Sequence, residues 1–195
     1  YDSIVSQMLD EARIESVSIV TERQNHAFDI VRNESFNIEE FDAIVLIGGD
    51  GLIYEVVNGI GGRKQKGMDI LQNVPLACVP GGTGNGLAKS ALYESDDECY
   101  SARSATFMAI KGTSSPFDLS EVMTTNDSEK KYAFLSMSWG LISDLDIRSE
   151  WMRWIGEIRL HLAAFYFMLA KHAYNGRLLL HLVEGLGGVE RATED

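Results

Sequence analysis

The sequence predicts a doubly wound α/β domain followed by part of a second, antiparallel β-rich domain. Two short apolar runs, residues 43–47 and 75–79, each end in a glycine-rich loop, and a helix-like stretch follows each loop. This strand, loop and helix order is typical of parallel β-α-β units. Beyond Gly112 the pattern changes to alternating polar and apolar residues, which is typical of antiparallel strands.

We assign residues 1–112 to the first domain. Its continuous apolar strands indicate a sheet that is covered on both faces. In chain order its expected elements are a helix at 1–12, a β-rich segment at 16–21, a helix at 25–32, a strand at 41–47, a helix at 52–60 stopped by Gly59 and Gly61-Gly62, a strand at 75–79, a helix at 86–92 and a strand at 106–110.

We assign residues 113–195 to the second domain. The alternation in 116–123 and 132–139 predicts an antiparallel pair. A helix is expected over about 149–174, because apolar residues recur there at three- and four-residue steps and form one face. Residues 178–183 resemble a strand, and the charged, glycine-rich residues 184–195 are expected to be loose.

Composition narrows the possible partners and compartments. The net charge of −12 opposes binding to nucleic acid. Two cysteines, Cys78 and Cys99, do not form a disulfide framework, so we expect a reducing compartment. The longest apolar stretch is far shorter than the roughly 20 residues that cross a bilayer. The chain lacks an initial Met and a secretory signal, so we expect a fragment.

The two glycine loops are candidate phosphate sites. They are Gly48-Gly49-Asp50-Gly51 and 80–85, which reads P-G-G-T-G-N. Glycines let backbone approach a ligand closely, and the first N–H groups of a helix lack partners within the helix. Thr83 and Asn85 add hydroxyl and amide donors. The loops match neither the G-K-[ST] phosphate loop nor the dinucleotide G-x-G-x-x-G pattern.

Asp50 is unusual because a carboxylate beside phosphates is unfavourable unless it has a function. It could hold Mg²⁺, accept a proton from an attacking hydroxyl, or cap the helix that begins at Gly51. Glu55 returns to the same side of that helix. It could orient a ribose hydroxyl, an arginine or a metal-bound water, or it could be an ordinary solvent-exposed residue.

Several separated motifs resemble the diacylglycerol kinase and sphingosine kinase superfamily. I-G-G-D-G-L-I-Y-E-V-V-N-G and P-G-G-T-G-N-G-L-A resemble its catalytic domain. T-E-R-Q-N-H-A at 21–27, S-M-S-W-G-L-I-S-D-L-D at 136–146 and Y-N-G-R-L at 174–178 resemble the sphingosine kinases within it. The resemblance covers nearly the whole chain and implies a Rossmann-like, phosphofructokinase-like fold.

The resemblance also implies roles. Asp50 would be the general base on a lipid's primary hydroxyl. Nucleotide-binding roles would fall to Thr21, Glu22, Arg23, Gln24, Asn25, Gly48, Gly49, Gly51, Glu55, Gly82, Thr83, Gly84, Asn85, Arg153 and Arg159. Substrate-binding roles would fall to Asp146, which would receive an ammonium group, and to Asp144, Ser136, Leu141, Ile142, Leu145 and Leu160. Metal ligands are not identified.

The amine role of Asp146 has a physical argument of its own. Sphingosine carries an amine near its reacting hydroxyl, whereas ceramide and diacylglycerol do not, so a buried carboxylate would be left unpaired by a neutral lipid. For Asp144 and Asp146 the alternative is a turn or cap before the helix at Ser149. For Leu141, Ile142, Leu145, Leu160 and Phe165 the alternative to a lipid slot is ordinary core.

The expected function is transfer of the ATP γ-phosphate to sphingosine, with Mg²⁺, in the cytoplasm and with transient docking at a membrane surface. The family's N-P-x-G-G-x-G type loop and most of its β-rich domain are missing from residues 1–195. The alternatives are therefore a ceramide or diacylglycerol kinase, or a non-catalytic binding module. The oligomeric state does not follow from the sequence.

Overall fold

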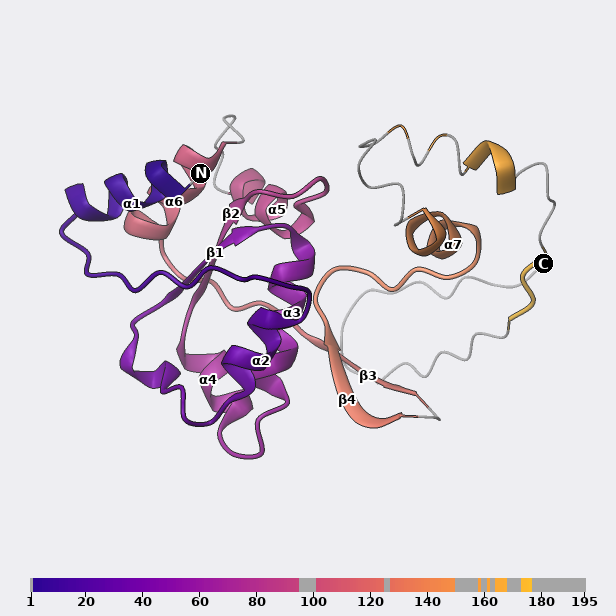
Figure 1. The fold of residues 1–195 in the computed structure, drawn as a ribbon, viewed down its shortest axis with the longest axis horizontal. Coiled ribbons are helices and arrows are strands. Elements are labelled where there is room, and N and C mark those ends of the chain that lie inside the picture. The colour runs from indigo at the N-terminus through magenta and orange to yellow at the C-terminus, as the bar shows by residue number, and fades with distance from the viewer. Residues whose placement is uncertain are drawn as a thin grey trace, which may run out of the picture. The chain divides into compact units, whose positions relative to one another are not determined.

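The computed structural model describes residues 2–94, 101–124, 127–149, 158, 161, 164–167 and 173–176. They divide into two compact units, Tyr1–Met137 and Ser138–Asp195. The sequence prediction places the domain boundary at residue 112 instead. The β-hairpin that follows residue 112 packs on a helix of the first unit, and this explains the later division. Figure 1 shows the elements of both units.

The centre of the first unit is a parallel pair of strands, β1 (Ile44–Gly48) and β2 (Leu76–Pro80). Ile44 lies opposite Leu76, and Gly48 lies opposite Pro80, so both strands end at the same edge. Helices α3 (Asp50–Gly61) and α4 (Gly67–Asn73) connect them. The mixed α/β organisation that the sequence predicts is confirmed.

Helices cover both faces of this sheet, as the continuous apolar strands require. On one face Leu46 of β1 packs in a core with α2 (His26–Arg32), the 3₁₀ turn η1 (Ile38–Glu40), α3 and α4. On the other face Val79 of β2 packs in a core with α1 (Asp2–Glu11), α5 (Gly86–Glu94) and α6 (Ala102–Lys111). The alternating side chains of β1 therefore serve two separate cores.

Two glycines of α3 allow close packing. The helix continues through Gly59, where the sequence predicts a stop. A Cβ on Gly59 would lie 2.7 Å from the carbonyl oxygen of Phe28, so only glycine lets α2 approach α3 this closely. The helix ends at Gly61, followed by Gly62 as its C-cap.

An antiparallel hairpin completes the first unit. It consists of β3 (Ser120–Thr124) and β4 (Asp127–Ala133), with Glu121 opposite Tyr132. The predicted antiparallel pairing is confirmed, but β4 ends at Ala133, so the predicted strand at 132–139 is wrong over most of its length. The buried Tyr132 joins the core formed by α2, α3 and α4.

The second unit contains α7 (Leu141–Arg148), a helix that is not among the predicted elements. Asp144 and Asp146 lie within it, so the alternative of a turn or cap before the helix at Ser149 is wrong. Gly140 precedes it with a φ of 78°, which favours glycine. The rings of Trp139 and Tyr174 meet edge to face with centroids 6.0 Å apart. Residues 158, 161 and 164–167 are helical, in agreement with the predicted helix at 149–174. The rest of that helix, the strand at 178–183 and the tail at 184–195 lie outside the described residues.

Two further predictions of secondary structure are wrong. Residues 16–21 form no strand, and Val17 and Val20 are exposed. Residues 106–110 belong to α6 rather than to a strand. Ser101 begins this helix by accepting a hydrogen bond from the N–H of Ser104 on its side chain, and Ala102 and Ala105 face the core. Helix α4 has no counterpart among the predicted elements.

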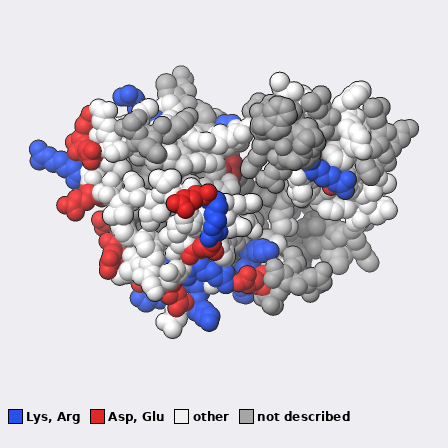
Figure 2. Space-filling view, in the orientation of Figure 1, with Lys and Arg blue, Asp and Glu red and all other residues white. Residues whose placement is uncertain are grey.

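Charged side chains are mixed on the visible surface of the first unit. Figure 2 shows acidic and basic groups interspersed there rather than separated into patches of one sign. Among the described residues no helix is long and apolar enough to cross a membrane.

Candidate active site

The two glycine loops touch at the common end of β1 and β2. The N–H of Gly81 donates to the carbonyl of Gly48 at 2.9 Å. A Cβ on Gly82 would lie 2.6 Å from the Cα of Gly49, closer than side-chain atoms tolerate. The contact therefore explains a glycine at each of these positions. Of the predicted nucleotide site, the structure brings Gly48 and Gly49 against the second loop at Gly81 and Gly82, and Gly84 against Asp50. Gly51 and Thr83 are their neighbours in sequence, and their roles stay predictions.

Asn85 shapes the second loop from within. Its side chain accepts from the N–H of Gly82 at 2.7 Å and donates to the carbonyl of Gly82 at 2.6 Å. The residue is buried and has a φ of 53°, a left-handed conformation that Asn tolerates better than most residues. The Asn85 amide, which the sequence analysis gives as a donor to phosphate, is hydrogen-bonded to the loop itself. The assignment of Asn85 to nucleotide binding stays a prediction.

Asp50 joins the first loop to the helix after the second. It is the first residue of α3, whose N-cap is Gly49, so the proposal that Asp50 caps α3 is wrong. Its Oδ2 accepts from the N–H of Gly86 at 2.9 Å, and its Oδ1 accepts from the N–H of Leu87 at 3.2 Å. These N–H groups begin α5, so the carboxylate caps that helix.

This capping changes the expected anion site. The sequence offers the first N–H groups of both helices to phosphate, but two of those in α5 already bind Asp50. Each carboxylate oxygen has a second lone pair, so Asp50 can still accept a proton from a substrate hydroxyl. The half-buried carboxylate is thereby fixed in direction at the junction of the loops.

Cys78 lies in β2 close to this carboxylate. Burial, and secondarily the negative charge of Asp50, raises the pKa of Cys78 to about 11. The thiol is therefore neutral and unreactive at neutral pH.

Glu55 connects α3 to the exposed segment 21–25. Its Oε1 accepts a hydrogen bond from the backbone N–H of Asn25 at 2.9 Å. Asn25 has a φ of 60°, and the N–H of Glu22 donates to Nδ1 of His26 at 3.0 Å. Arg23 pairs with Asp29 at 2.6 Å. The segment that contains Thr21, Glu22, Arg23, Gln24 and Asn25 is therefore bonded through Asn25 to the helix that begins with Asp50, and its role in nucleotide binding stays a prediction.

The second unit contains the predicted amine-binding region. Asp144 accepts from the Tyr174 hydroxyl at 2.6 Å and pairs with Nε of Arg148 at 3.2 Å. Both of its carboxylate oxygens already have partners within the unit. A substrate that binds Asp144 would have to compete with Tyr174 and Arg148. The neighbouring Asp146 lies in α7, and its side chain is outside the described residues, as are Arg153, Arg159 and Leu160.

The apolar residues proposed for a lipid slot are not buried together. Leu141 and Ile142 are exposed, and Leu145 is half-buried. Phe165 is also exposed. The described residues therefore give these side chains no shared core, and their roles in substrate binding stay predictions.

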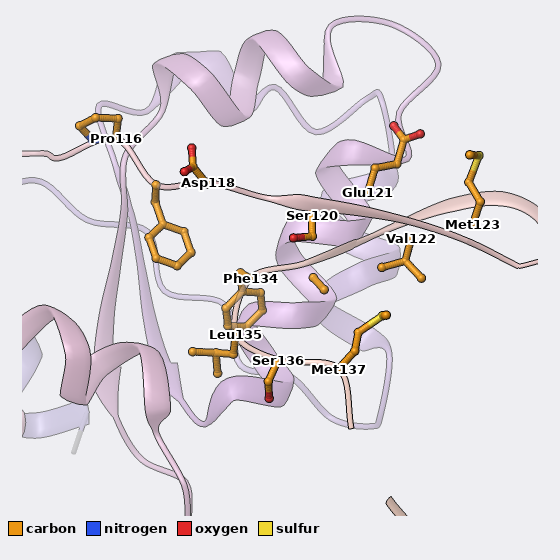
Figure 3. A pocket seen from close by; sticks show the side chains of 12 residues that line it. Pro116, Asp118, Ser120, Glu121, Val122, Met123, Phe134, Leu135, Ser136 and Met137 are labelled. Carbon is orange, nitrogen blue, oxygen red and sulfur yellow. The ribbon is translucent and has the colours of Figure 1, made fainter. Parts of the chain in front are cut away.

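Ser136, another predicted substrate-binding residue, lines a groove within the first unit. This groove of about 760 Å³ is lined by the hairpin and by the segments that flank it. Figure 3 shows the side chains of Asp118 and Glu121 pointing to the same side of the chain. Phe134, Leu135, Ser136 and Met137 come from the segment that leaves β4.

Two residues that connect the hairpin to the helices of the site were not among the predicted site residues. Asn58 is buried in α3 and bonds to the backbone of Tyr132. Leu135 lies against α5, since its Cδ1 is 3.1 Å from the position of a Cβ on Gly86. Asn58 could have been found from the sequence, because it is a polar residue inside the apolar run V-V-N-G. Leu135 could not, because its role depends on a contact between segments that are distant in the sequence.

The donor set limits what metal the site could hold. Within the described part of the chain, no group of three or more His, Cys, Asp or Glu side chains could hold a metal ion. Mg²⁺ commonly uses only one or two carboxylates and takes its remaining ligands from phosphates and water. A single carboxylate, that of Asp50, is therefore enough to bind Mg²⁺ together with phosphates and water.

A model of a known protein family matches more than half of the chain. Residues 3–122 match the diacylglycerol kinase catalytic domain. The chain belongs to that family. Both loops, Asp50 and Glu55 lie within the matched family domain.

Within the family, the chain is similar to sphingosine kinases. It is 35% identical over 175 residues to "Sphingosine kinase 1" of Arabidopsis thaliana, covering 90% of this chain and 35% of that protein. It is 36% identical over 182 residues to "Sphingosine kinase 1" of Homo sapiens, covering 91% and 46%. It is 35% identical over 156 residues to "Sphingoid long chain base kinase 4" of Schizosaccharomyces pombe, covering 78% and 31%. The predicted resemblance is confirmed, and the chain spans a third to a half of these relatives.

Proposed function

We propose that this chain is part of an ATP- and Mg²⁺-dependent kinase that phosphorylates the primary hydroxyl of sphingosine. The observation that carries the proposal is the Asp50 carboxylate, fixed by Gly86 and Leu87 where two glycine loops meet. Similarity to sphingosine kinases supports the choice of lipid. Asp146 would pair with the ammonium group of the sphingoid base.

The proposed reaction is an in-line phosphoryl transfer. The substrate hydroxyl oxygen forms a bond to the γ-phosphorus of ATP, the bond from that phosphorus to the bridging oxygen breaks, and ADP leaves. Asp50 accepts the hydroxyl proton. Mg²⁺ would neutralise phosphate charge. Segment 21–25 and Glu55 would hold the nucleotide from one side, and the loop at 80–85 from the other.

We further propose a Rossmann-like, doubly wound arrangement for the nucleotide-binding domain, residues 1–112. Helices on both faces of the β1–β2 sheet support this. Residues 113–195 would form part of a lipid-binding domain. Because the acceptor resides in a bilayer, a cytoplasmic protein that docks transiently at membranes fits the chemistry.

The test uses the complete natural protein that contains this chain, radiolabelled ATP, and sphingosine, ceramide or diacylglycerol in mixed micelles. We expect sphingosine to be the fastest acceptor. Asp50→Asn should lower turnover about 10²- to 10⁴-fold, the usual contribution of a general base, with nucleotide affinity nearly unchanged. Wild-type turnover in Asp50→Asn would refute the base assignment.

The same assay separates the alternatives. Equal rates on sphingosine and diacylglycerol would contradict amine recognition and favour a less selective lipid kinase. Asp146→Asn should reduce sphingosine phosphorylation far more than nucleotide binding. An assay of residues 1–195 alone tests whether they bind nucleotide without turnover, as a binding module would.

A further inference from the structure

Asn58 is a buried polar side chain whose amide pairs with the backbone of a distant strand. Its Nδ2 donates to the carbonyl of Tyr132 at 2.9 Å, and its Oδ1 accepts from the N–H of Tyr132 at 2.8 Å. Nδ2 also donates to the carbonyl of Tyr54 at 3.0 Å. Asn58 is only 7% exposed, so these bonds satisfy its hydrogen-bonding groups away from water.

The pairing fixes one register between α3 and β4. The amide binds both the N–H and the C=O of a single residue, so a shift of β4 by one residue would break both bonds. Gly61 adds a steric condition, because a Cβ there would lie 2.6 Å from the Tyr132 ring. An apolar side chain at position 58 would fill the same volume without specifying this register.

The other end of the same arrangement is Asp50. Asn58 lies about two turns along α3 from Asp50, a rise of about 12 Å. The chain leaving Tyr132 reaches Leu135, whose Cδ1 lies 3.1 Å from the position of a Cβ on Gly86. The N–H of Gly86 donates to Asp50. Helix α3, the chain that includes and follows the end of β4, and the start of α5 are therefore each in contact with the other two.

Residues 134–137 line the groove of the first unit (Figure 3). Leu135 links this segment to Asp50, because the Leu135 Cδ1 and the Asp50 Oδ1 lie 3.1 and 3.8 Å from the position of a Cβ on Gly86. Leu135 is 48% exposed and Met137 is 74% exposed, so the segment presents apolar surface, and at Leu135 this surface lies near the carboxylate. That placement suits a lipid acceptor whose hydroxyl must reach Asp50.

We infer that Asn58 is a positioning residue that holds segment 134–137 at the correct distance from Asp50 for the acceptor. This inference rests on the proposed function, because it takes the acceptor to be a lipid. It assigns Asn58 to the acceptor side of the reaction rather than to the nucleotide side. Gly61 acts in the same way through the Tyr132 ring.

The test compares Asn58→Leu with Asn73→Leu in the complete natural protein. Asn73 is an exposed helical asparagine that donates to the carbonyl of Asp69 at 2.7 Å, so it is a matched control. We expect Asn58→Leu to raise the KM for sphingosine at least 10-fold while the Kd for an ATP analogue changes less than threefold. Asn73→Leu should change neither. Equal losses in both constants would overturn the inference.

A second variant and a second measurement keep the inference testable. If Asn58→Leu does not fold, Gly61→Ala displaces the Tyr132 ring and leaves the amide in place, and we expect the same split between KM and Kd. Hydrogen exchange of the peptide covering 132–137 should accelerate in either variant and stay unchanged in Asn73→Leu. Unchanged exchange would overturn the inference. If wild type phosphorylates no lipid, the proposed function fails, and the exchange result still judges the role of Asn58.

Discussion

The Asp50 carboxylate caps helix α5 through the backbone N–H of Gly86, at 2.9 Å from Oδ2. The same carboxylate is the proposed acceptor of the substrate proton. Its position thus depends on two chain segments, the loop after β1 and the helix after β2, rather than on its own rotamer alone. A change in either loop should alter the direction in which Asp50 points.

The first prediction contrasts two glycines of the loops. In Gly82→Ala the new Cβ would meet the Gly49 Cα at 2.6 Å, so the loops must separate. We expect the free energy of unfolding to fall by about 1–3 kcal/mol, with loss of nucleotide binding. Denaturant unfolding and titration with a fluorescent ATP analogue measure both quantities.

Gly51→Ala is the matched control. A Cβ on Gly51 would meet no atom within 4 Å, and alanine favours a helix by about 1 kcal/mol over glycine. We expect this variant to be at least as stable as wild type, yet to bind nucleotide more weakly if the ligand occupies that open space. Unchanged nucleotide affinity in Gly51→Ala would place the nucleotide elsewhere.

The second prediction concerns Glu55 and its bond to the N–H of Asn25. Glu55→Ala removes the acceptor and should loosen segment 21–25, whereas Glu55→Gln keeps an oxygen in place. A net hydrogen bond of about 1 kcal/mol corresponds to about a fivefold weaker nucleotide affinity in Glu55→Ala. Calorimetric titration checks this. An equal loss in Glu55→Gln would show that the charge, not the hydrogen bond, matters.

The third prediction concerns the reactivity of Cys78. Because its pKa is raised to about 11, alkylation by iodoacetamide should be slow at pH 8 and should rise with pH until near 11. The measurement follows the peptide that contains Cys78 by mass spectrometry, which separates it from Cys99, the other cysteine of residues 1–195. Adding Asp50→Asn should lower the pKa of Cys78, since it removes the negative charge that contributes to the shift. An unchanged pH profile would contradict the proximity of the two side chains.

The fourth prediction concerns Tyr174 and Asp144. The hydrogen bond to Asp144 raises the pKa of Tyr174 above its usual value of about 10. The folded state binds this proton more tightly than the unfolded state, so the bond stabilises fully below pH 10 and is lost as the pH rises through the folded-state pKa. Wild type should therefore exceed Tyr174→Phe in stability at pH 8, and the difference should shrink above pH 10. Thermal unfolding against pH measures this, and a constant difference would refute the assignment.

The sequence predicts those parts of the fold that short-range patterns determine. The apolar runs at β1 and β2 and the glycines after them locate the strands, the loops and Asp50. For residues 106–110 of α6 the sequence predicts a strand, because their β-branched and apolar residues fit either structure. Its identity depends on the Ser101 cap and on packing of Ala102 and Ala105 in the core shared with α1 and β2.

In the candidate site too, the sequence identifies individual residues but not the residues that they contact. Motifs identify Asp50, Glu55 and the glycines, because their residue types are unusual at those positions. The partners of these residues come from distant segments. Asp50 meets α5, Glu55 meets Asn25 and Asn58 meets Tyr132, and only the tertiary structure brings each pair together.

The Asn85 side chain closes the second loop with two hydrogen bonds of its own. The loop therefore loses its conformational entropy when the protein folds, and a ligand that binds there does not have to order it. Such preorganisation favours fast association in a single kinetic step, without a slow rearrangement after encounter. Asn85 thus links the folding of the domain to the speed with which its loop can capture a ligand.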